Sequence, residues 1–233
     1  MQIENHKEEV PFGYYEGLFE KLDPMEAVER TGVKWDGKEF YVNLLGVEYA
    51  IAHPKYGIRT VDCHSERPTG VEESVTPNRR ISPLGCASVE MTEGVKDIPL
   101  QVQTFLLRYL LEAKQVAWGG TWKTFREMPW GEMYIKPYTG RVLTRAAFTF
   151  GTRVENFRAA CEKMGGKKLP HGDAGYQFDL IGNYAMQILV WEGDEEFPPN
   201  AQVIYTDNFA EGFAAEDRVV AGDILISTIK QNM

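Results

Sequence analysis

Four carboxylates within five residues form the densest cluster of chemically capable side chains in the sequence. Residues 192–196, here called the acidic turn, contain Glu192, Asp194, Glu195 and Glu196, and they lie between an apolar run and two prolines. Carboxylate oxygens at this density suit magnesium or calcium, a cationic ligand or a substrate. The spacing is not that of an EF-hand loop, and a solvated turn between two strands has the same composition. The sequence leaves a metal site, a ligand site and a plain turn open.

A tryptophan, an arginine and a glutamate form a second candidate group. Trp122 and Arg126 are four residues apart, so they would share one face of the short helix that we expect over residues 121–128. An aromatic plane beside a guanidinium is a common way to hold a planar or anionic ligand. The same side chains would serve equally well as a core anchor and a structural ion pair.

The position of Glu127 next to Arg126 leads to a hypothesis that this second group and the acidic turn lie together. On a helix, Arg126 and Glu127 point in different directions and do not pair well. We therefore expect Arg126 to reach a carboxylate of the acidic turn. That pairing would place Trp122, Arg126, Glu127 and Asp194 around one shared cleft. The full candidate set for ligand binding is Trp122, Arg126, Glu127, His171, Asp173, Asp194, Glu195 and Glu196.

His171 and Asp173 flank a glycine just before a predicted strand. A histidine and an aspartate two residues apart in a loop can act as acid and base, or as two metal ligands. Turn formation explains the glycine and the aspartate equally well, and the sequence offers no third partner. No complete catalytic motif occurs, so catalytic residues and cofactors stay unassigned, and we assign no metal site.

Local patterns predict the elements that must position these residues. Alternating apolar residues and turn signals predict strands over 33–61, 176–180, 184–191 and 201–205. Helical spacing and capping residues predict helices over about 14–22, 24–31, 98–110, 152–165 and 216–230. Antiparallel strand clusters separated by helices predict an α+β fold, with a mixed, mainly antiparallel sheet and packed helices. We expect a single domain over 1–233, with a long loop over 64–97.

Composition narrows the range of partners. The net charge of −9 disfavours nucleic acid and anionic membranes as partners, and no apolar run approaches membrane-spanning length. The polar N-terminus lacks the apolar stretch of a signal peptide, so we expect a cytoplasmic protein. The three cysteines are far apart and form no CxxC pair, which argues against a disulfide framework.

Two segments resemble a known family in their order and wording. Residues 119–129 read GGTWKTFREMP, and residues 191–199 read WEGDEEFPP. The chain resembles the domain-of-unknown-function family 3786 over about residues 98–230. The family occurs mostly in anaerobic bacteria and archaea, and some members carry a four-iron–four-sulfur domain of the corrinoid-protein type. The resemblance implies work near corrinoid or redox chemistry, although this chain has no cysteine cluster at its N-terminus.

These observations lead to three functional expectations. We expect a small-molecule or cofactor-binding accessory protein of anaerobic metabolism, and a large apolar pocket would favour it. One alternative is a carboxylate-dependent enzyme using the acidic turn, which would need perturbed carboxylates at the base of a cleft. The other is a protein-interaction domain, which would need a broad exposed apolar patch. The partner is accordingly a small-molecule ligand or another protein.

Overall fold

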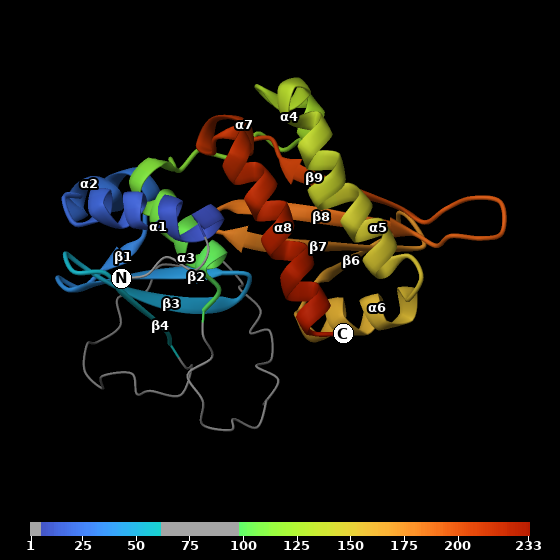
Figure 1. Cartoon of the computed structure of the whole chain (residues 1–233), viewed down its shortest axis with the longest axis horizontal. Coiled ribbons are helices and arrows are strands. Elements are labelled where there is room, and N and C mark those ends of the chain that lie inside the picture. The colour runs from blue at the N-terminus through green and yellow to red at the C-terminus, as the bar shows by residue number, and fades with distance from the viewer. Residues whose placement is uncertain (1–5, 62–97) are drawn as a thin grey trace, which may run out of the picture.

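The computed structural model describes residues 6–61 and 98–233, and it contains a nine-stranded sheet with helices packed against it (Figure 1). The expected α+β class is confirmed. All strand pairs in these two ranges are antiparallel, so the described sheet has no parallel component. No helix in the same ranges is both long enough and apolar enough to cross a membrane. The predicted loop over 64–97 lies outside the described residues.

The sheet joins an N-terminal meander to a C-terminal group of longer strands. Its main path runs β4-β3-β2-β7-β8-β9-β5, with β1 paired to β2 and β6 paired to β7. The two groups meet where Leu44 pairs with Ile181. The strands are β1 (Lys34–Trp35), β2 (Glu39–Leu44), β3 (Val47–Ala52), β4 (Gly57–Thr60), β5 (Trp122–Thr124), β6 (Lys167–Leu169), β7 (Ala174–Ile181), β8 (Tyr184–Trp191) and β9 (Asn200–Thr206).

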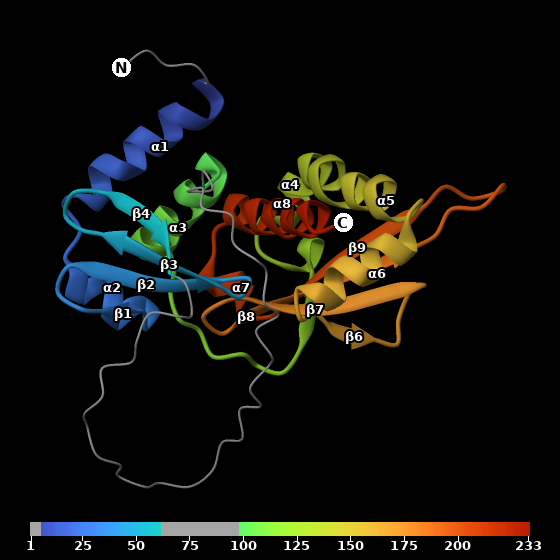
Figure 2. The same cartoon turned by 90° about the horizontal axis from the view of Figure 1, so that it is seen from below.

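Helices cover one face of the C-terminal strands. In Figure 2, α4, α5 and α8 lie together on one side of the β7–β9 layer. The helices are α1 (His6–Phe19), α2 (Pro24–Thr31), α3 (Leu100–Glu112), α4 (Gly131–Tyr138), α5 (Arg145–Phe150), α6 (Val154–Lys163), α7 (Phe209–Gly212) and α8 (Ala215–Gln231).

The period-two pattern of the strands decides which face enters the core. Tyr176, Ile188 and Val203 are direct neighbours across β7, β8 and β9, and all three are fully buried. The next row, Gln177 and Gln187, points to the opposite face and is partly exposed. Burial of the first row against the helices contributes about 1.5–3 kcal/mol per large side chain.

Local capping explains why α2 begins and ends where the sequence predicts. Asp23 is its N-cap, and its Oδ1 accepts a hydrogen bond of 2.9 Å from the backbone N–H of Met25. Pro24 occupies the first turn, where a missing N–H costs nothing. Gly32 ends the helix with a φ of 70°, a conformation that glycine adopts without strain.

A helical stretch over residues 131–150 was not predicted. It consists of α4, a π-helical turn over Thr139–Thr144, and α5. Pro137 lies inside α4 and provides no backbone N–H, so the helix lacks the hydrogen bond from position 137 to the Met133 carbonyl. Pro137 and Gly140 read as helix breakers in the sequence, and packing against β9 and α8 overrides them.

Two local predictions are wrong. Residues 121–128 form strand β5 and a 3₁₀ turn over Phe125–Glu127 instead of a helix, because β5 pairs with β9. The capping residue expected at the start of the helix over 152–165 is also absent, since α6 begins after Arg153, without a side-chain cap.

Candidate ligand-binding pocket

Hydrogen bonds between carboxylates and backbone N–H groups hold the acidic turn. Asp194 Oδ1 accepts hydrogen bonds from the backbone N–H groups of Glu196 at 2.8 Å and Phe197 at 2.7 Å. Glu195 and Glu196 are exposed. Asp173, from the loop before β7, accepts a bond of 2.8 Å from the backbone N–H of Glu192. The structure therefore brings Asp173 to the acidic turn, in a role that stabilises the turn.

His171 is exposed, and its side chain makes no hydrogen bond to any described residue. It is close to Asp173 in sequence, yet Asp173 directs its carboxylate at the backbone of Glu192. An acid–base or metal-binding pair between His171 and Asp173 has no supporting contact. In the described ranges no group of three His, Cys, Asp or Glu side chains lies close enough to hold a metal ion.

The predicted pairing of Arg126 with the acidic turn is wrong. Arg126 Nε lies 2.8 Å from Glu132 Oε2, and both side chains are exposed. Glu127 forms a capping box instead, accepting bonds of 2.7 Å from the backbone N–H and the hydroxyl of Thr124. These bonds, first that from the Thr124 hydroxyl, lower the pKa of Glu127. Arg126 and Glu127 thus have local structural partners.

The shared cleft predicted for Trp122, Arg126, Glu127 and Asp194 is also wrong in geometry. Trp122 pairs with Thr206, six residues along β9 from Asn200, where the loop that carries the acidic turn joins the strand. Six strand residues span about 20 Å. Trp122 instead packs edge-on against Trp118 and lines a separate hollow of about 210 Å³. Whether any of these residues binds a ligand remains a prediction.

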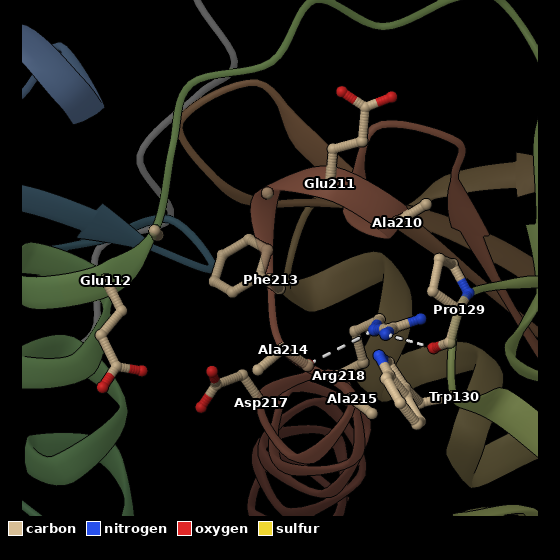
Figure 3. Close-up of a pocket in the computed structure, with 12 residues that line it drawn as sticks. Glu112, Pro129, Trp130, Ala210, Glu211, Phe213, Ala214, Ala215, Asp217 and Arg218 are labelled. Carbon is tan, nitrogen blue, oxygen red and sulfur yellow. Dashed lines mark hydrogen bonds between the residues drawn. The ribbon is translucent and has the colours of Figure 1, made fainter. Parts of the chain in front are cut away.

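A different pocket lies at the N-terminal end of α8 (Figure 3). Its volume is about 310 Å³, at the small end of the range for ligand sites. Four separate segments build it: the end of α3, the loop before α4, α7 with the link that follows it, and the first turn of α8. The lining residues are Glu112, Ala113, Pro129, Trp130, Ala210, Glu211, Gly212, Phe213, Ala214, Ala215, Asp217 and Arg218.

The first turn of α8 presents backbone donors at this pocket. Its N-cap is Ala214, whose side chain has no acceptor for the first N–H groups. The earliest backbone N–H groups of a helix have no partner within the helix, and the helix dipole adds positive potential there. Anions are therefore stabilised at such an end.

Arg218 is the cation of the pocket and is only 1% exposed. Its Nη2 donates to the carbonyl of Pro129 at 2.7 Å, and its Nε donates to the carbonyl of Ala214 at 3.3 Å. Its Nη1 is buried without a hydrogen-bond partner. Burial lowers the pKa of Arg218, but an arginine with donors this well placed stays charged at neutral pH.

The loop that carries Pro129 and Trp130 is held in an unusual conformation. Trp130 has a φ of 63°, in the left-handed region that bulky residues rarely adopt. Its indole is 67% exposed and lies beside the Arg218 guanidinium in Figure 3. Gly131 follows because a Cβ there would collide with the Phe125 carbonyl oxygen. The strain at Trp130 places an exposed aromatic ring at the edge of the pocket.

Carboxylates line the opposite side of the pocket. Arg108 Nε lies 2.5 Å from Asp217 Oδ1, and Arg108 Nη2 lies 3.2 Å from Glu112 Oε2. Burial raises the pKa of Asp217, and the ion pair with Arg108 opposes this effect.

Sequence reasoning missed both Trp130 and Arg218. The sequence does hold a signal for Arg218. This arginine falls on a face of the predicted C-terminal helix that otherwise consists largely of apolar and small residues. A charged residue at such a position is costly unless it has partners or a function. Trp130 carried no signal, because its exposure and left-handed backbone are set by the loop.

Comparison with known proteins identifies a family for this chain. The family described as Domain of unknown function (DUF3786) matches residues 78–228, more than half of the chain. No curated protein and no solved structure matches this chain significantly.

Proposed function

Since this chain belongs to the DUF3786 family, whose description states no activity, we propose a function from the pocket itself: the protein binds a small molecule that carries an anionic group. The anionic group accepts hydrogen bonds from Arg218 and from the first backbone N–H groups of α8. Phe213 and Trp130 contact its apolar part. Membership of an anaerobic pathway stays a prediction from the family resemblance.

The observation that carries the proposal is the unpartnered Nη1 of Arg218. A buried charged donor without an acceptor costs about 1–3 kcal/mol or more. An anionic ligand group would satisfy it. Because Nη1 is buried, the ligand must displace a neighbouring side chain to reach it. Trp130 lies beside the Arg218 guanidinium and is largely exposed, so moving its indole gives up little buried contact area.

The enzyme alternative receives less support. The carboxylates of the acidic turn are exposed, and Asp194 is committed to its own turn. A general acid or base needs a substrate held beside it, and neither of the two hollows described above is lined by the acidic turn.

A second candidate function, binding of a partner protein, has one specific observation in its favour. Trp130, Met133 and Tyr134 precede or begin α4 at helical spacing and are exposed by 67%, 72% and 40%. An aromatic and methionine surface of this kind is typical of protein contacts. Sedimentation of a Met133→Lys variant beside the wild type would test it, since loss of a self-associated species would support protein binding.

The ligand proposal can be tested with compact aromatic anions. We expect 3-phenylpropionate or phenyl phosphate to bind with a change in tryptophan fluorescence, because Trp130 moves on binding. A Trp130→Phe variant should bind with little of that change. Isothermal titration calorimetry would measure the affinity independently of fluorescence.

A matched pair of variants ties binding to this pocket. Ala210→Phe fills the pocket from α7 and should abolish binding of both anions. Ala117→Phe adds the same ring at an exposed position that lines neither hollow, and it should bind like the wild type. Equal binding by both variants would show that the anions bind elsewhere and would overturn the proposal.

A further inference from the structure

The charges around the α8 pocket fall on two sides. In Figure 3, the carboxylates of Asp217 and Glu112 lie together on one side, and Arg218 and Trp130 lie on the other. The ring of Phe213 lies above the two carboxylates, and the carboxylate of Glu211 points away from both groups. The pocket therefore has a cationic side and an anionic side.

The ion pairs within each side of the pocket leave part of its charge uncompensated. Arg108 is one cation between two carboxylates. Its Nη2 donates a hydrogen bond to Asp217 and pairs with Glu112, and its Nε forms an ion pair with Asp217. One unit of negative charge is left over on that side. Arg218 forms no ion pair with any described carboxylate, and its hydrogen bonds go to carbonyl oxygens. One unit of positive charge is left over on its side.

A ligand with one charge would complement only half of this arrangement. A simple anion would satisfy Arg218 but would lie near the surplus carboxylate, and like charges close together repel. A simple cation would leave the buried Nη1 of Arg218 without an acceptor. A molecule bearing both an anion and a cation a few atoms apart satisfies both sides.

We propose that the pocket binds an amino-carboxylate of the size of a single amino acid, with its carboxylate at Arg218 and the α8 N-terminus and its ammonium toward Glu112 and Asp217. The proposal rests on the anionic-ligand function above and specifies its ligand class. Phe213 and Trp130 flank the side chain, which favours an aromatic or aliphatic one. The pocket volume of about 310 Å³ suits a molecule this small.

Three probes of matched shape test the two charges separately. L-Phenylalanine carries both groups, 3-phenylpropionate lacks the ammonium, and 2-phenylethylamine lacks the carboxylate. By titration calorimetry on the full chain, we expect L-phenylalanine to bind about tenfold more tightly than 3-phenylpropionate, as the loss of one charged hydrogen-bond donor predicts. We expect 2-phenylethylamine to bind most weakly.

A charge-neutral variant locates the ammonium. Glu112→Gln should weaken L-phenylalanine about fivefold, as expected for one partly exposed charge pair, and leave 3-phenylpropionate unchanged or slightly tighter. Glu29→Gln, which removes the same charge from an exposed position of α2 outside the pocket, should change neither affinity.

The outcomes separate this inference from the function on which it rests. Equal affinity for L-phenylalanine and 3-phenylpropionate would overturn the amino-carboxylate class and leave an anion-binding pocket. Tighter binding of 2-phenylethylamine than of either carboxylate would overturn both proposals. Binding of none of the three probes would also count against both.

Discussion

At the scale of single residues, the proposed function gives Arg218 two roles, one structural and one in ligand binding. It ties the loop at Pro129 to the start of α8 through two carbonyl oxygens, and it presents a third nitrogen with no acceptor. Side chains that both hold a scaffold and bind a ligand are difficult to test by deletion, because removal of one partner leaves other groups unsatisfied.

A conservative substitution of Arg218 makes the structural part measurable. Arg218→Lys keeps the charge but loses the fork that reaches both carbonyls. We expect the free energy of unfolding in urea to fall by about 2–3 kcal/mol. Arg153→Lys, at an exposed position whose side chain bonds no described residue, should change it by less than about 0.5 kcal/mol. Similar stability of the two variants would contradict a structural role for Arg218.

Asp207 organises the loop that carries Trp118 and Trp122. Its carboxylate accepts bonds from the Thr121 hydroxyl at 2.6 Å and from the backbone N–H groups of Gly119 at 2.9 Å and Thr121 at 3.2 Å. These bonds, first that from the Thr121 hydroxyl and next that from Gly119, lower the pKa of Asp207 below its ordinary value of 3.8.

The lowered pKa of Asp207 gives a pH dependence of known sign. The folded state holds the ionised carboxylate more strongly than the unfolded state, so this stabilisation is complete above the ordinary pKa of 3.8 and disappears as pH falls through the lower folded pKa. The melting temperature of the wild type should therefore exceed that of Asp207→Asn at pH 7, and the gap should narrow below about pH 4. A gap that stays constant down to pH 2 would show that the carboxylate bonds contribute nothing.

At the scale of elements, short helix α7 is tightly fitted between the sheet and the pocket. A Cβ on Gly212 would collide with the hydroxyl of Tyr184 on β8, which also bonds the backbone around Lys114 and Val116. The glycine lets α7 approach β8 closely, and Phe213 then enters the pocket wall.

A pair of glycine substitutions tests this close approach. Gly212→Ala should destabilise the protein by about 1–3 kcal/mol or more, because the clash involves a ring held by hydrogen bonds. Gly140→Ala, in the helical stretch over 131–150 with open space around it, should be neutral or stabilise by up to about 1 kcal/mol. Thermal denaturation of both variants provides the comparison, and equal melting temperatures would refute the packing argument.

At the scale of the whole molecule, the sheet has a strong centre and weaker ends. Strands β7 and β8 have eight residues each, with largely buried side chains and strand partners on both sides. Strand β4 is a four-residue edge strand with mostly exposed side chains. Local stability follows burial and pairing, so opening of the molecule should begin away from β7 and β8.

Hydrogen exchange would measure this gradient of stability. We expect amides of β7 and β8 to exchange by global unfolding only, and amides of β4 to exchange much faster through local opening. Exchange of β8 as fast as that of β4 would mean that the sheet does not form one cooperative unit.

The sequence by itself determined the features that depend on neighbouring residues. The range of α2, the strands of the meander, strands β7 and β8 and helix α8 were all predicted, because hydrogen-bonding caps and apolar periodicity act over a few residues. The α+β class followed from the order of these elements. The single-domain prediction and the roles proposed for the acidic turn remain predictions.

Only the tertiary structure decided where the candidate binding residues come together. Residues 122–124 became a strand because β9, some eighty residues later, supplied the pairing partner. The same pairing separated Trp122 from the acidic turn along the length of β9. The pocket combines α3, the loop at Trp130, α7 and α8, and the unpartnered nitrogen of Arg218 exists only once these four segments pack together. No local pattern reports such a site, since its burial and charge balance are properties of long-range contacts.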